Sequence, residues 1–187
     1  MTTLSPARTL VAFGLWLMGY SQPIGLFAQT YQPNFSDALV MGGWVSPVGA
    51  TWDTNGRLYV WEKRGQVWIV ENGVRLPNPL LNISDEVGDW RDHGFLGFAL
   101  DPNFTTNGYI YGMYAVDRHH LMNHGTGSYN ANTNEYYAAT IMRITRWTAI
   151  GPSFNAVNYG TRQVLVGETR FTGVPLLHES HSTGSLM

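Results

Sequence analysis

The sequence predicts an all-β fold built from short antiparallel strands. From about Val45 onward, apolar residues alternate with polar ones at period two, the spacing of a strand whose two faces differ. Clusters of Gly, Asn, Asp and Pro interrupt this alternation at short intervals, as turns between strands do. The composition agrees, because 21 Gly, 9 Pro and 13% aromatic residues favour strands and tight turns. Beyond the apolar N-terminal stretch, no segment shows clear helical periodicity.

The first strands are expected to form a meander. The alternating segments are 48–53 (VGATWD), 57–62 (RLYVWE) and 66–71 (QVWIVE). The turn segments Thr54-Asn55-Gly56 and Lys63-Arg64-Gly65 separate them, and Asn72-Gly73 follows the third. Short strands joined by tight turns that contain Gly are typical of antiparallel hairpins. A fourth, Pro-broken segment over 76–87 is consistent with an edge strand.

A second group of strands follows with the same layout. The expected strands are 94–101 (GFLGFALD), 109–116 (YIYGMYAV), 140–149 (TIMRITRWTA) and 162–167 (RQVLVG). Residues 117–139 form a long polar insertion, and loops of this length in a compact domain are usually functional or disordered. In 140–149 we expect Ile141, Arg143 and Thr145 on one face and Met142, Ile144 and Arg146 on the other.

The whole pattern is typical of a sandwich, a barrel or a propeller. Two four-stranded units of similar layout favour a repeat architecture, in which each unit needs neighbours to cover its apolar faces.

The N-terminal stretch has the layout of a secretory signal peptide. Arg8 precedes a short apolar run from Leu10 to Gly19, and Ala28 is a small residue at a plausible cleavage point. The sequence thus predicts a leader over 1–28 and a mature domain over 29–187, secreted or periplasmic. A membrane anchor that is never cut is the alternative, because Leu26 is a poor residue three positions before the cut. After cleavage we expect no membrane association.

Charge and cysteine content exclude several function classes. The formal net charge is −2 and charged residues make up 13% of the chain, so there is no basic surface for nucleic acid or an anionic membrane. The chain has no Cys, which excludes disulfides and thiolate chemistry.

Three stretches resemble one family. They are WDTNGRLYVWEKRGQVWIV, DHGFLGFALDPNFTTNGYIY and the terminal HSTGSL, which agree in order and rough spacing across 45–187. Together they are similar to the soluble quinoprotein glucose/sorbosone (aldose sugar) dehydrogenases. The resemblance implies a secreted six-bladed β-propeller that uses pyrroloquinoline quinone (PQQ) and calcium to oxidise an aldose at C1, with an external electron acceptor. It also implies that the chain is an N-terminal fragment, holding only the first blades.

His181 is the candidate catalytic residue. It matches the family's general base, which takes the proton of the sugar C1 hydroxyl while hydride passes to the quinone. An imidazole titrates near pH 6.5 and suits that role at neutral pH. The alternative is an exposed loop His bonded to Ser180 or Ser182. Some family members carry an acidic residue just before this His, where the chain has Ser180.

Asp92, Tyr136 and Tyr137 are candidate substrate- or cofactor-binding residues. Asp92 stands where family members carry Gln or Glu facing the substrate and cofactor, although a turn-capping role is the alternative. We expect the insertion to border the substrate entrance, with its His residues and Tyr136 or Tyr137 stacking on sugar rings.

Two clusters do not favour a metal site. His119, His120 and His124 lack a further ligand at a recognised spacing. Asp85, Glu86, Asp89 and Asp92 do not match the EF-hand pattern, and we interpret them as a solvated acidic turn.

The fragment lacks most of the implied cofactor site. In the family, the cations that bind PQQ and the calcium loop lie in later blades, and this chain has 11 Lys and Arg with none clustered near His181. The sequence therefore predicts that the chain alone neither binds PQQ tightly nor oxidises sugar. A non-catalytic carbohydrate- or protein-binding propeller is the alternative function.

Overall fold

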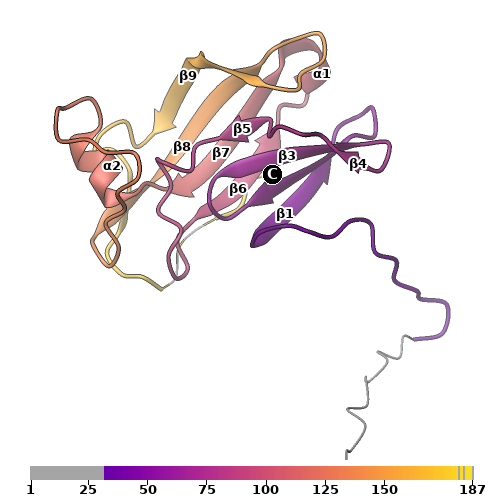
Figure 1. The fold of residues 1–187 in the computed structure, drawn as a ribbon, viewed down its shortest axis with the longest axis horizontal. Helices are drawn as coiled ribbons and strands as arrows, with labels where there is room; N and C mark the ends of the chain where they lie inside the picture. Colours follow the sequence, from indigo (N-terminus) through magenta and orange to yellow (C-terminus); the bar gives the residue numbers. More distant parts are fainter. Residues whose placement is uncertain (1–31, 181, 183, 187) are drawn as a thin grey trace, which may run out of the picture. The chain divides into compact units, whose positions relative to one another are not determined.

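The computed structural model describes residues 32–180, 182 and 184–186, and the chain divides into two units, 1–38 and 39–187. The predicted leader and His181 lie outside the described residues. In the first unit, the described part is a short segment in which the Phe35 amide donates to the carbonyl of Gln32. The second unit contains the strands and helices named below (Figure 1).

The first sheet is the predicted meander. Its strands are β1 (Pro47–Trp52), β2 (Leu58–Glu62), β3 (Gln66–Glu71), β4 (Val74–Arg75) and β5 (Leu81–Asn82). All pairings are antiparallel in the order β1-β2-β3-β4, and β5 also pairs with β3. Glu62 and Gln66 pair across the tight turn at 63–65, as the sequence predicted.

The second sheet repeats this layout. Its strands are β6 (Phe95–Leu100), β7 (Tyr109–Ala115), β8 (Thr140–Ala149), β9 (Val157–Val166) and β10 (Val174–Leu176). The order is β10-β8-β7-β6, with β9 also paired to β8, and every pairing is antiparallel. The all-β prediction is confirmed.

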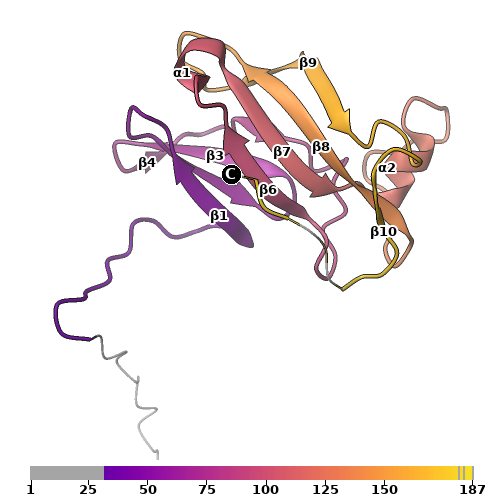
Figure 2. The same cartoon turned by 180° about the vertical axis from the view of Figure 1, so that it is seen from behind.

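One hydrophobic core joins the two sheets. Tyr59 and Ile69 of the first sheet share it with Phe98, Ile110 and Trp147 of the second. The rings of Tyr59 and Phe98 stack with centroids 6.3 Å apart, an offset geometry that aromatic pairs favour. Figures 1 and 2 show the sheets as two layers side by side, with β1 next to β6.

The alternation predicted for 140–149 is confirmed. Ile141 and Trp147 of β8 point into the shared core. Met142 points to the opposite face, where it packs with Ala115 and Leu176. On this opposite face Leu186 lies against Gly97 of β6, so the end of the described chain crosses to the far side of the second sheet.

Local details differ from the prediction. Two short helices, α1 (Phe104–Asn107) and α2 (Arg118–Asn123), stand in segments predicted as turn and loop. Each is too short to show helical periodicity in sequence and is stabilised by its surroundings: Phe104 is buried, and Asp117 caps α2. The strand predicted at 162–167 begins at Val157, β10 was not predicted, and the 76–87 segment contributes only β5. Within the described part of the chain, no helix has the length and apolar character needed to cross a membrane.

Candidate functional site

Four loops meet at one end of the two sheets. In the second sheet, the start of β6 pairs with the end of β7 (Phe95 with Tyr114), and the end of β10 pairs with the start of β8 (Leu176 with Thr140). The segments 88–94, 116–139 and 177–180 therefore leave the sheet at the same end. The 63–65 turn joins them, because the Phe95 amide donates to the carbonyl of Lys63 at 2.7 Å. We call this region the loop end.

The 88–94 segment is anchored by a buried histidine. The side chain of His93 is 1% exposed, and its Nε2 lies 3.0 Å from the carbonyl oxygen of His178. Its Nδ1 is buried without a hydrogen-bond partner among the described residues. Gly94 follows with φ +151°, and a Cβ there would lie 2.5 Å from Cγ of Lys63. Only glycine lets the backbone approach Lys63 so closely.

The predicted residue Asp92 lies beside the terminal segment. Its backbone amide donates to the carbonyl of Glu179 at 3.2 Å, two residues before His181. The structure thus brings Asp92 and the segment leading into His181 together across more than 80 residues of sequence. Its role toward substrate or cofactor stays a prediction.

The ring of Trp90 contacts the rings of both predicted tyrosines, Tyr136 and Tyr137. Its ring centroid lies 4.8 Å from that of Tyr137 and 6.3 Å from that of Tyr136. Tyr137 is 71% exposed and Tyr136 is 44% exposed, so the three rings offer an accessible aromatic surface. Burial and the nearby carboxylate of Asp89 raise the pKa of Tyr136, which keeps its hydroxyl protonated. Sequence reasoning missed Trp90, although an aromatic residue next to a predicted polar site was a usable signal.

The carboxylate of Asp117 holds the insertion in place. This side chain is buried, and Oδ1 accepts from the amides of His119 and His120 at 2.9 and 3.3 Å. Oδ2 accepts from the amide of Glu135 at 3.1 Å. One charged group thereby ties the start of α2 to the residues just before Tyr136.

Cations that are scattered in the sequence lie at the loop end. The ammonium group of Lys63 donates to the carbonyl of Arg91, and Nε of Arg91 lies 3.9 Å from Glu179. Arg64 is close enough to Tyr136 to oppose the rise in its pKa. The grouping of Lys63 and Arg64 with Arg91 forms only in the folded chain, so the sequence alone does not reveal it.

The residues just before His181 make hydrogen bonds and an ion pair. Nδ1 of His178 lies 2.9 Å from Oγ of Ser180 and accepts from the Ser180 amide at 3.2 Å. Glu179 faces Arg91, whose Nε lies 3.9 Å from its Oε1. The proposed base His181 itself stays a prediction, as does the alternative of a bond to Ser180 or Ser182.

The sequence analysis interpreted the acidic residues of segment 85–92 as a solvated turn, and this interpretation is wrong for Glu86. This side chain is buried and lies within 2.8 Å of two guanidinium groups, those of Arg143 and Arg162. His120 was expected to face sugar at the entrance, but it is buried and stacks on His124 at 4.4 Å. Among the described residues, no three His, Asp or Glu side chains are placed to hold a metal ion.

Comparisons with known proteins agree with this fold. A protein of Thermus thermophilus, provisionally named an oxidoreductase (glucose dehydrogenase), aligns over 78% of this chain and 35% of its own, with a TM-score of 0.54 and 20% identity. A structure described as glucose dehydrogenase gives a TM-score of 0.50 at 12% identity over 68% of this chain and 31% of its own. The PQQ-bound aldose sugar dehydrogenase of Streptomyces coelicolor aligns over 67% of this chain and 31% of its own, with a TM-score of 0.46 and 19% identity.

A sequence relative was also found, in Synechocystis sp. This uncharacterized protein is 26% identical over 129 residues, which cover 65% of this chain and 29% of the relative. The chain thus spans about a third of the length of the proteins it matches. Its two antiparallel sheets match part of a β-propeller-type fold, and the number of blades stays a prediction. Because the model of the glucose/sorbosone dehydrogenase family matches residues 44–163, well over half of the sequence, the protein belongs to that family.

Proposed function

We propose that this chain supplies the substrate-facing loops of a sugar dehydrogenase that oxidises an aldose at C1. The observation that carries the proposal is that candidate site residues lie together at the loop end. There the amide of Asp92 donates to the carbonyl of Glu179, and the ring of Trp90 contacts the rings of Tyr136 and Tyr137. Accessible aromatic faces pack against the C–H face of a sugar ring, and a carboxylate accepts hydrogen bonds from its hydroxyls.

The proposed chemistry assigns one step to each group. Trp90 and Tyr137 would hold the ring, and Asp92 would orient it through the hydroxyls. His181, if neutral, would take the proton of the C1 hydroxyl as hydride leaves C1, which gives the lactone. The two electrons must pass to an acceptor, and family resemblance supports PQQ, with calcium, in that role.

The described residues fit only part of such a cofactor site. PQQ carries three carboxylates, and the loop end offers Lys63, Arg64 and Arg91. Arg91 already faces Glu179, and no described trio of ligands is placed for calcium. We propose that the remaining groups belong to a longer protein, as the span of about a third of the matched relatives supports.

Steady-state oxidation of aldoses by the complete protein, loaded with PQQ and calcium and coupled to a dye acceptor, tests the proposal. We expect His181→Gln to lower kcat by about 100- to 10,000-fold. Trp90→Ala should raise KM more than it lowers kcat, since it removes ring contacts. Val74→Ala, at an exposed residue of β4 beside the end of β3 that is far from the 63–65 turn, serves as the control. Sugar binding without turnover in the loaded protein would contradict the enzyme and favour the non-catalytic alternative.

We also propose that the protein works outside the cytoplasm. The layout of residues 1–28 supports an exported precursor. Mass spectrometry of the mature protein should find an N-terminus at Gln29, and an intact N-terminus starting at Met1 would contradict export with cleavage.

A further inference from the structure

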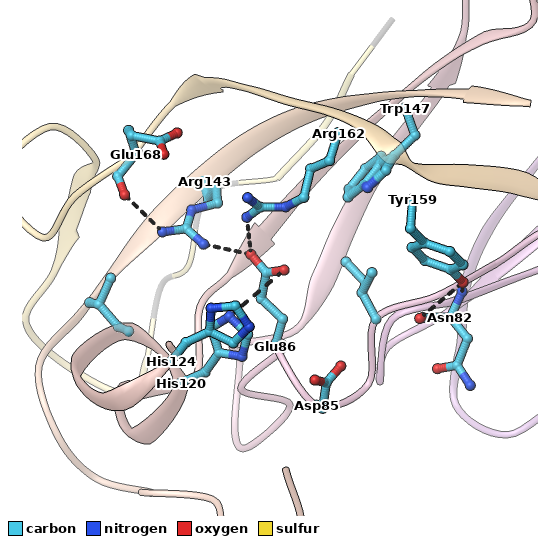
Figure 3. Close-up of a pocket in the computed structure, with 12 residues that line it drawn as sticks. Asn82, Asp85, Glu86, His120, His124, Arg143, Trp147, Tyr159, Arg162 and Glu168 are labelled. Atoms are coloured by element: carbon cyan, nitrogen blue, oxygen red, sulfur yellow. Dashed lines mark hydrogen bonds and ion pairs between the residues drawn. The ribbon is translucent and has the colours of Figure 1, made fainter. Parts of the chain in front are cut away.

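A second cavity borders the insertion at α2, apart from the rings of Trp90, Tyr136 and Tyr137. Its volume is about 380 Å³, and Figure 3 shows its walls. Residues from the loop after β5, from α2 and from strands β8 and β9 line it, among them Glu86, His120, His124, Trp147, Tyr159 and Arg162. His120 and His124 belong to the insertion, which is part of the loop end, but the lining includes none of Trp90, Asp92, Tyr136 and Tyr137.

The two arginines of the cavity are already neutralised in part. Oε1 of Glu86 accepts from Tyr114 at 2.6 Å, from Arg143 at 2.5 Å and from Arg162 at 2.8 Å. Arg143 also donates to the carbonyls of Gly167 and Glu168, so three of its five N–H groups are used. Arg162 makes one bond here and keeps more donor capacity. Three carboxylates, those of Asp85, Glu86 and Glu168, line the cavity with the two guanidinium groups, so it lacks the excess positive charge that an anion site needs.

The tautomer of His120 leaves an acceptor in the cavity. The single hydroxyl proton of Tyr129 is donated to Oδ2 of Asp85 at 2.9 Å, so its oxygen accepts from Nδ1–H of His120 at 3.0 Å. In the neutral ring Nε2 is then a lone-pair acceptor, and it faces Oε2 of Glu86 across 4.0 Å. Burial, the main cause, lowers the pKa of His120 and favours this neutral form. Two acceptors that face each other repel unless a donor lies between them, and a ligand hydroxyl would supply that donor.

Trp147 forms a buried wall of the cavity. Its indole is fully buried, and its Nε1–H has no hydrogen-bond partner among the described residues. Because this nitrogen has no accessible surface, a ligand in the cavity does not reach it in this structure. The accessible donor is Arg162, whose side chain is 33% exposed.

The rim carries a fixed aromatic ring. Tyr159 is 52% exposed, yet its hydroxyl accepts from the amide of Asn82 at 2.9 Å and donates to the carbonyl of Asn82 at 3.2 Å. Figure 3 labels Tyr159 together with Trp147 and Arg162 among the residues that line the cavity. These two bonds hold the ring in one orientation, so a stacked ligand would not have to order it.

We propose that this cavity binds a neutral saccharide, at a site distinct from the aromatic surface of Trp90, Tyr136 and Tyr137. Sugar hydroxyls donate and accept at once, which matches the facing acceptors of Glu86 and His120 and the donor of Arg162. The face of Tyr159 would cover the C–H face of the ring. A cavity of about 380 Å³ falls in the range of small-molecule sites.

Calorimetric titration of the intact chain with methyl β-D-glucoside and methyl α-D-mannoside tests the site. Methyl glycosides have no free C1 hydroxyl, so they report binding that is independent of oxidation. We expect saturable binding of at least one glycoside, weakened roughly tenfold by Tyr159→Ala. Tyr159→Phe keeps the ring and should weaken it less, and Trp52→Ala, at an exposed aromatic residue of β1 outside both regions, is the matched control.

Three results would overturn the proposal. The first is no saturable binding of either glycoside to a chain shown to be folded by its thermal transition. The second is binding that Tyr137→Ala abolishes and Tyr159→Ala leaves unchanged, which would place the sugar at the loop end alone. The third is competition by inorganic phosphate that Arg162→Gln removes, which would identify an anion site. Failure of this site leaves the kinetic test of the loop end untouched.

Discussion

Replacing Glu86 by Gln tests whether the buried charge cluster stabilises the fold. The side chain of Glu86 is 7% exposed, and that of Arg143 is 6% exposed. Gln keeps the shape and one acceptor but removes the charge, which leaves Arg143 buried without a counterion. Breaking a buried pair in this way costs about 3–5 kcal/mol of unfolding free energy. The side chain of Arg162 is 33% exposed and can turn to water, so we expect the lower end, about 3 kcal/mol.

The pH dependence of the stability difference gives a second, sharper test of the buried charge of Glu86. Burial alone would raise the pKa of Glu86, but Arg162 and Arg143 outweigh it, and the pKa lies below its ordinary value. A lowered folded-state pKa means that the charge stabilises the fold above the unfolded pKa of about 4.3, and that this contribution is lost as the pH falls through the folded value. The stability difference between the native chain and Glu86→Gln should therefore be constant near neutrality and shrink below about pH 4.

Urea unfolding followed by tryptophan fluorescence at about pH 7 and about pH 3.5, on either side of that unfolded pKa, measures this difference. Glu179→Gln is the control, because the side chain of Glu179 is 31% exposed and that of its partner Arg91 is 61% exposed, at 3.9 Å. A surface pair of this kind contributes about 0–1 kcal/mol. A loss below about 1 kcal/mol for Glu86→Gln at neutral pH, or a loss that is the same at both pH values, would refute the reasoning.

Three further predictions concern the loops and the first sheet. Asp117→Ala should cost about 1–3 kcal/mol, because it leaves buried amides unpaired, and limited proteolysis should then cut faster within 117–139 than in the native chain. Gly49→Ala drives a methyl group into the Trp61 ring and should lower stability by about 1–3 kcal/mol, seen as a lower Tm. Gly127→Ala is the control, because the space around Gly127 is open, and it should leave Tm nearly unchanged. Calorimetry of the isolated chain with PQQ should show no submicromolar binding, and tight binding would contradict the incomplete cation set proposed for the loop end.

Several features could be predicted because they depend on neighbours in sequence. The alternation in 57–62 and 66–71 and the turn at 63–65 reflect local backbone geometry, and the structure has the hairpin in that register. The helix α2 could not be predicted in the same way, since six residues carry no periodic signal and the cap depends on the folded insertion.

The sequence by itself determined most of the strands, the faces of β8 and the resemblance to a dehydrogenase family, because these follow from residue type and short spacing. Only the tertiary structure decided that Glu86 is buried, since its partners Arg143 and Arg162 lie 57 and 76 residues further along the chain. The same holds for Trp90 and the cations of the loop end. Burial and charge pairing depend on which distant segments meet, and a linear pattern carries that information only through the fold.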